Sequence, residues 1–192
     1  MLENGKKLSM HNDAIYKGDF SHNGTLLKLH ENSYTIGYSA LLSKDGKSAG
    51  TVKFGDGVFY NAKEKNNRVY AGVPTATNAV AVFAGIMVRE PAIASGYPVL
   101  NDEVSGFQNG LIVKEGYVIY KEAYVGTGTE KENVFESEDV TFGTSLFVKA
   151  TDGTVYFADT KGATADVLAG KVVELNPDDK SVTVYISPAI TA

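Results

Sequence analysis

The sequence of 192 residues contains no cysteine and no tryptophan, and its only histidines are His11, His22 and His30. A chain without cysteine cannot form disulfides, thiolate metal sites or a thiol nucleophile. A catalytic triad would have to take its histidine from the first 30 residues, and a metal site needs ligands held on rigid elements. We therefore predict no catalytic, cofactor-binding or metal-binding residue, and we interpret the three histidines as solvated.

Long apolar runs are also missing. The most apolar stretch, residues 79–88 (AVAVFAGIMV), is too short to span a bilayer and is typical of a buried strand. The start of the chain, residues 1–7, lacks the apolar segment that a secretory signal requires. We expect no membrane association.

Positive charge is scarce in the second half of the chain. Residues 1–96 carry eleven Lys and Arg against eight Asp and Glu, whereas residues 97–192 carry seven against fifteen, for a net charge of −5. Because an acidic surface repels phosphates, we expect no nucleic-acid partner. The asymmetry is compatible with one face that meets a partner and another that faces solvent.

What the sequence has in quantity is residues that favour strands and turns, including 20 glycines, 11 tyrosines and 9 phenylalanines. Short apolar or alternating runs are separated by Gly, Asn, Asp and Pro, which predicts an all-β fold, sandwich-like or barrel-like. The expected strands are 35–42, 50–54, 58–62, 68–73, 79–88, 98–100, 110–114, 117–124, 140–142, 146–150, 154–158, 171–175 and 181–186.

Two hairpins are clearly indicated near the end of the chain. The pair Asp152-Gly153 can adopt the positive φ angles of a tight hairpin turn. The turn at 176–179 contains a proline, which fixes a backbone angle that suits a turn. Residues 163–168 are the one weak helix candidate. The polar residues 1–33 predict an extended N-terminal arm, with a floppy terminus as an equal alternative, and residues 34–192 predict an all-β domain.

The sequence contains a candidate internal repeat. Residues 52–62 (VKFGDGVFYNA) align with residues 140–150 (VTFGTSLFVKA), and the alignment continues in order. Arg68-Val-Tyr70 then matches Thr154-Val-Tyr156, and 84–88 (AGIMV) matches 169–173 (AGKVV). This order predicts two related β modules, at about 50–90 and 139–175, which should pack on each other because each is small.

Two further segments resemble binding motifs only weakly. The Gly-x-Gly text of Val125–Thr129 is followed by acidic residues and not by a helix, so we interpret it as a loop. The acidic run Glu130–Asp139 lacks the spacing of an EF-hand calcium loop, and we interpret it as a solvated loop.

Several short motifs of packing and turn residues follow one another in a characteristic order. They are AVFAGIMVRE at 81–90, GYPV at 96–99, GLIV at 110–113, GYV at 116–118, VTFG at 140–143, LFV at 146–148 and AGKV at 169–172. This order resembles the decoration (cement) proteins of tailed-phage capsids, over residues 34–186.

The resemblance implies a structural protein without enzymatic activity. Such a protein binds the outer surface of the phage head, stabilises the lattice of the major capsid protein and often self-associates into homo-oligomers. It would be made in the host cytoplasm and reside on the exterior of the virion capsid. Two alternatives stay open: a head-fibre, tail or surface β module that recognises a receptor or glycan, and a small hydrolase such as a glycosidase with paired carboxylates.

Overall fold

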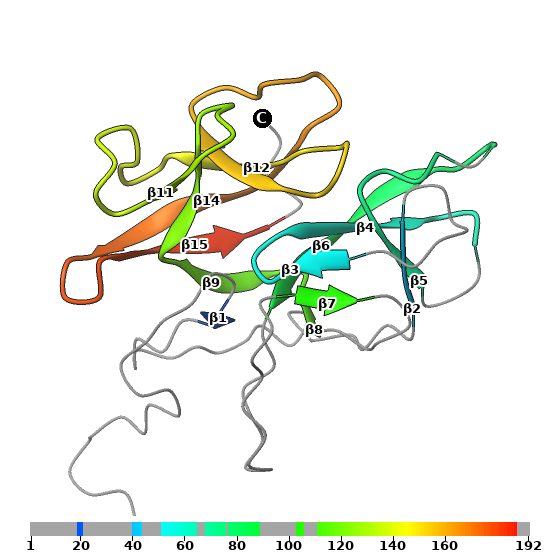
Figure 1. Cartoon of the computed structure of the whole chain (residues 1–192), viewed down its shortest axis with the longest axis horizontal. Helices are drawn as coiled ribbons and strands as arrows, with labels where there is room; N and C mark the ends of the chain where they lie inside the picture. Colours follow the sequence, from blue (N-terminus) through cyan, green and yellow to red (C-terminus); the bar gives the residue numbers. More distant parts are fainter. Residues whose placement is uncertain are drawn as a thin grey trace, which may run out of the picture.

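The computed structural model describes residues 51–64, 68–75, 77–88 and 111–187, together with the strand segments 19–20, 40–43 and 103–105. This part of the chain contains strands β1–β15 and no helix, so the all-β prediction is confirmed (Figure 1). The same residues contain no helix long and apolar enough to cross a membrane. The arm expected at 1–33 and the strand expected at 98–100 fall outside the described residues, apart from β1 (Asp19–Phe20).

The first sheet has five strands in the order β2-β5-β4-β6-β8. Their bounds are Ala40–Ser43 for β2, Gly57–Asn61 for β4, Arg68–Ala71 for β5, Ala81–Val88 for β6 and Leu111–Val113 for β8. Strand β2 runs parallel to β5, and the other neighbours are antiparallel. A separate pair, β3 (Thr51–Lys53) and β7 (Glu103–Ser105), lies beside this sheet (Figure 1).

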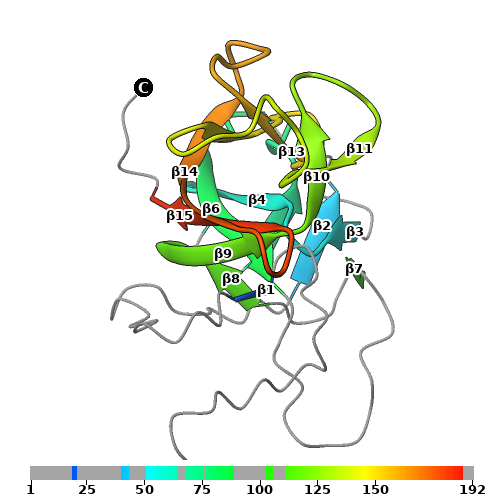
Figure 2. The ribbon, with the colours of Figure 1, turned by 90° about the vertical axis from the view of Figure 1, so that its left-hand side faces the viewer.

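The second sheet has eight strands in the order β1-β9-β15-β14-β12-β13-β10-β11. The bounds are Gly116–Tyr120 for β9, Glu122–Val125 for β10, Lys131–Asn133 for β11, Ser145–Val148 for β12, Val155–Ala158 for β13, Val167–Asn176 for β14 and Ser181–Ile186 for β15. Both expected hairpins, β12–β13 and β14–β15, are present. Along the long axis of the molecule, the strands of both sheets curve round a common interior (Figure 2).

The five strands of the first sheet match five consecutive strands of the second. We call β2, β4, β5, β6 and β8 the first unit, and β10, β12, β13, β14 and β15 the second unit. Each unit begins with a strand that pairs in parallel, β2 with β5 and β10 with β13. The central strand of each, β4 or β12, has two antiparallel neighbours, and the fifth strand closes the same edge.

The register of the two units also corresponds. Val58 pairs with Gly85 in the first unit and Leu146 with Gly170 in the second, and a bulge follows directly after both pairs. A side chain at either glycine would collide with a backbone carbonyl of the neighbouring strand, Val113 or Tyr185. Both glycines are therefore required by the close approach of the next strand at the same point of the unit.

The turn that enters the central strand is the same in both units. The amide of Gly55 donates a 2.7 Å hydrogen bond to the carbonyl of Met87, and that of Gly143 donates one of 2.9 Å to Val172. These are the positions that the sequence alignment pairs. The two units therefore share strand order, register and turn hydrogen bonds over stretches that extend beyond 50–90 and 139–175 on both sides.

The hydrophobic core lies in two clusters. The larger one joins both sheets, because Phe59, Ile86 and Val113 of the first unit pack with residues of the second unit such as Leu146 and Val184. The smaller cluster covers the other face of the first sheet; its buried members are Val52, Phe54, Val58, Val69, Ala84, Met87 and Ile112. The two units thus form one packed body.

Several sequence-based expectations differ from the structure. The strand expected at 117–124 is interrupted at Lys121, and the strands β7 and β11 were not expected. The strand expected at 140–142 is wrong, because these residues form turns; the amide of Thr141 bonds the hydroxyl of Thr144 at 2.9 Å. The helix candidate 163–168 is also wrong, since a turn ends at Asp166 and β14 follows.

Candidate functional site

A polar pocket of about 210 Å³ opens where the two units meet. Its lining carries two ammonium groups, two carboxylates and three hydroxyl groups. The lining residues are Thr51, Lys53, Asp56, Tyr124, Lys131, Asp152 and Thr154.

One wall of this junction pocket comes from β3 and the turn after it. Strand alternation points Val52 into the core, with 2% of its surface exposed, and leaves Thr51 and Lys53 exposed on the other side. Asp56 lies in the turn before β4 and is only 8% exposed. The wall therefore has an exposed rim and a buried carboxylate.

The opposite wall comes from the second sheet. Tyr124 of β10 pairs with Lys131 of β11, which sets the two side chains next to each other at the edge of the sheet. Asp152 and Thr154 belong to the β12–β13 turn, where an Asp152 carboxylate oxygen accepts a 2.9 Å hydrogen bond from the amide of Thr154. That bond fixes the backbone of the turn and the position of the carboxylate.

Backbone hydrogen bonds lock the two walls together. The amide of Gly57 donates to the carbonyl of Gly153 at 2.7 Å, and the amide of Val73 donates to the carbonyl of Ala150 at 2.8 Å. Gly153 has a φ of 80°, and a side chain there would collide with the Gly57 carbonyl. Only glycine can occupy position 153 at this close contact. The contact and the two hydrogen bonds fix the position of one pocket wall relative to the other.

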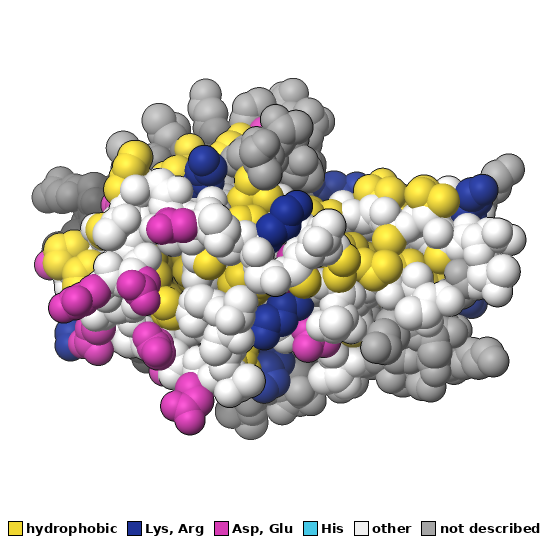
Figure 3. Space-filling view, turned by 90° about the horizontal axis from the view of Figure 1, so that it is seen from above, with side chains coloured by type: hydrophobic (Ala, Val, Ile, Leu, Met, Phe, Trp, Pro, Cys, Tyr) yellow, Lys and Arg dark blue, Asp and Glu magenta, His cyan; other side chains and the backbone are white. Residues whose placement is uncertain are grey.

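The charges in and around the pocket are mixed. Lys53 and Lys131 are both exposed and both line the pocket, where they face the carboxylates of Asp56 and Asp152. The ammonium of Lys149 lies 5.6 Å from the centre of the Tyr124 ring, within cation–π distance. A band of basic side chains crosses the middle of the face seen from above, and acidic side chains gather beside it over the second unit (Figure 3).

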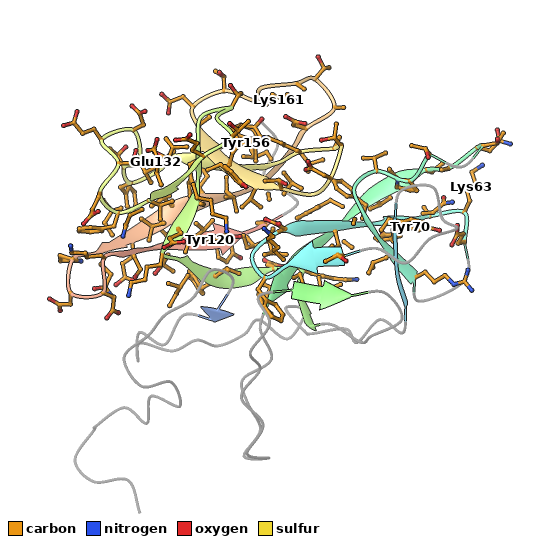
Figure 4. The ribbon with its side chains drawn as sticks, viewed as in Figure 1. Lys63, Tyr70, Tyr120, Glu132, Tyr156 and Lys161 are labelled. Carbon is orange, nitrogen blue, oxygen red and sulfur yellow. The ribbon has the colours of Figure 1, made fainter. Side chains whose placement is uncertain are left out.

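Tyrosines at equivalent positions of the two units each donate a hydrogen bond to a carboxylate. The hydroxyl of Tyr70 donates to Glu64 at 2.6 Å, and that of Tyr156 donates to Asp166 at 2.8 Å. Burial and the neighbouring carboxylate raise the pKa of each hydroxyl to about 12. Figure 4 shows Tyr70 at the far end of the first unit and Tyr156 within the second. We assign these contacts to stability.

Asp166 organises the loop that precedes β14. Besides the Tyr156 hydroxyl, its carboxylate accepts hydrogen bonds from the amides of Ala150 and Ala163, each at 3.1 Å. The Tyr156 oxygen in turn accepts a 2.6 Å bond from the amide of Gly162. The side chain of Asp166 is 8% exposed, so this carboxylate is held by its partners in a nearly buried position.

One large apolar side chain stands out on the surface. Phe142 is 73% exposed, whereas its counterpart in the first unit, Phe54, is 7% exposed and packs in the smaller core cluster. The turn that carries Phe142 is pinned by the Gly143–Val172 hydrogen bond and by buried Val140. The acidic residues Glu136–Asp139 directly precede this turn.

The motifs weighed in the sequence contribute little to the pocket. The Gly-x-Gly segment is a turn after β10, and the acidic run forms β11 and the turns after it, contributing only Lys131 to the lining. Over the residues with described side chains, no group of three or more His, Cys, Asp or Glu is placed to hold a metal ion. The three histidines lie outside the described residues. Sequence reasoning missed the pocket, since its lining comes from separate stretches at 51–56, 124–131 and 152–154.

In comparisons with known proteins, no protein-family model and no curated protein matches the chain.

Proposed function

We propose that the protein is a non-enzymatic decoration protein that binds the outer surface of a tailed-phage head and stabilises the major capsid protein lattice. It attaches through preformed surfaces, self-associates into homo-oligomers and resides on the capsid exterior. The motif order described above supports this proposal, together with a rigid body of two packed units. A ligand that binds only the assembled lattice stabilises it by mass action, and many modest sites add together.

The observation that carries the proposal is the exposure of Phe142. An aromatic ring that is 73% exposed on a pinned turn offers apolar area at little cost in conformational entropy. Aromatic side chains are enriched at protein interfaces, where a few anchors contribute most of the binding energy. Because the residues before the turn are acidic, the complementary capsid surface would be an apolar depression with a basic rim.

The test is co-sedimentation of the purified protein with assembled capsid shells and with free capsid subunits. We expect binding to shells only, and we expect Phe142→Ser to weaken it by at least about tenfold, as loss of an interface anchor does. Val80→Ser is the matched control, because Val80 is 44% exposed on the first unit. Failure of the unaltered protein to bind shells would overturn the proposal. If Phe142→Ser bound shells as tightly as the unaltered protein, Phe142 would not be an interface anchor.

A second measurement addresses stabilisation directly. Particles stripped of the protein should release DNA at a lower temperature than intact particles, and adding the protein back should restore the higher temperature. Equal release temperatures would favour the alternative role, a head-fibre, tail or surface module that recognises a receptor or glycan. The junction pocket is the feature that favours this second role.

A further inference from the structure

We propose that the junction pocket binds one acidic sugar residue, that is, a polyhydroxylated ring that carries a carboxylate. The pocket is distinct from the proposed capsid anchor, because its lining does not include Phe142. The size of the pocket, the balance of its charges and the hydrogen bonds that hold its walls together point to this ligand.

The volume of the pocket restricts the ligand to a small molecule. Sites for drug-sized ligands typically measure roughly 300–1,000 Å³. A pocket of about 210 Å³ suits a single ring with its substituents. The rim residues Thr51, Lys53 and Asp152 are exposed, so a ring at the end of a longer saccharide can enter while the remaining chain stays in solvent.

The charges of the lining select a singly charged ligand. Lys53 and Lys131 approach the pocket from opposite walls and provide ammonium groups for a carboxylate. The carboxylates of Asp56 and Asp152 balance these two charges, so the pocket repels a phosphate dianion more than a lone carboxylate. A single carboxylate is thus the anion that the lining accommodates best.

The remaining polar groups fit the hydroxyls of a sugar. The Asp152 carboxylate accepts hydrogen bonds, and the Thr51 and Thr154 hydroxyls both donate and accept them. Tyr124 adds a half-buried aromatic ring to the same wall. Because hydrogen bonds between the units fix both walls, little conformational entropy is lost when a ligand binds.

The experiment titrates the full chain with a panel of acidic monosaccharides: glucuronate, galacturonate, mannuronate and N-acetylneuraminate. Glucose and inorganic phosphate are the comparison probes, and binding is followed by calorimetry and by amide chemical shifts. We expect at least one acidic sugar to bind and to shift the amides of residues 51–56, 131 and 152–154. Glucose and phosphate should bind at least about tenfold more weakly than the acidic sugar. Added salt should weaken the binding of the acidic sugar, because it screens the charges.

Variants locate the binding. The double variant Lys53→Gln with Lys131→Gln should lower the affinity by at least about tenfold, because two charge-assisted contacts are lost. Lys161→Gln, an exposed lysine outside the lining, should leave the affinity unchanged. The exposed positions of both lysines make unfolding of the double variant unexpected, and a circular dichroism melt checks this. No binding by any acidic sugar, equal binding of phosphate, or an unaffected double variant would each overturn the proposal.

Discussion

The hydroxyl of Tyr120 donates a 2.9 Å hydrogen bond to the backbone carbonyl of Gly55, which lies 65 residues earlier in the chain. Tyr120 is fully buried, and its ring meets that of Phe157 edge-on at 5.7 Å. Burial, with the nearby Asp56 carboxylate, raises the pKa of this hydroxyl well above its usual value. One side chain of the second sheet therefore fixes the turn that enters β4, the central strand of the first unit, and that carries Asp56.

Removing this hydroxyl should destabilise the protein. Tyr120→Phe keeps the ring but leaves the Gly55 carbonyl without this donor, which costs about 1–3 kcal/mol of unfolding free energy. Urea unfolding measures the loss. Tyr117→Phe is the control, because Tyr117 is half-buried and contacts Tyr185 through its ring. Equal stability of the two variants would contradict the assigned role of the Tyr120–Gly55 bond.

The close approach of Gly57 to Val148 should appear as coupling between two substitutions. A Cβ atom at Gly57 would lie 2.9 Å from one Val148 methyl group, nearer still to the other, and 3.2 Å from the Phe83 ring. We expect Gly57→Ala to cost about 1–3 kcal/mol through overpacking and Val148→Ala to relieve part of that cost. A double-mutant cycle by urea unfolding checks this, and strict additivity would show that the residues do not press on each other.

The Asp166 carboxylate should be a strong determinant of stability. Asp166→Ala removes the acceptor for the Tyr156 hydroxyl and for the amides of Ala150 and Ala163, and we expect a loss of about 2–4 kcal/mol. The pKa of Tyr156 should also fall, since Asp166 contributes to raising it. Asp159→Ala, at an exposed position of the same loop, serves as control. Unfolding curves and an absorbance titration of tyrosinate provide the two readouts.

Stability should decline at alkaline pH. The folded protein holds the pKa of Tyr70, Tyr156 and Tyr185 at about 12, against 10.0 for the free side chain. For Tyr185 the main cause is its hydrogen bond to Glu115; for the other two it is burial. Between pH 10 and 12 the unfolded chain loses protons that the folded chain retains, so the unfolding free energy falls as pH rises.

This stabilisation is fully present below pH 10 and is lost through pH 12. Unfolding by urea at a series of pH values measures the decline. Tyr185→Phe should make the decline shallower, because one of the contributing groups no longer titrates. A constant unfolding free energy across the window would refute the assigned contacts.

Much of the fold was predictable because its signals are local. The hairpins around Asp152-Gly153 and 176–179 depend on turn residues that lie within a few positions of each other. The alignment of 52–62 with 140–150 pairs the positions that share register and turn hydrogen bonds in the structure. Local chemistry and an internal comparison were sufficient there.

The errors arose where a distant partner decides the outcome. Residues 51–53 form a strand because β7 pairs with them, whereas 140–142 have no such partner among the described residues and turn instead. The sequence from Tyr117 to Tyr124 predicts one strand, yet the strand breaks at Lys121. Before the break, β9 pairs with β15; after it, β10 pairs with β13 and β11. The junction pocket was unpredictable for the same reason.

The position of β15 has a consequence for the order in which the protein can be completed. Residues 181–186 are the last of the described strands along the chain, yet they lie inside the second sheet, between β14 and β9. Until they emerge from the ribosome, two strands present open edges that can pair with other nascent chains. The first unit needs nothing beyond β8 to complete its own sheet. Synthesis therefore passes through a stage in which all strands of the first sheet can pair while the second sheet lacks an internal strand, and a chain truncated before Ser181 would remain at that stage.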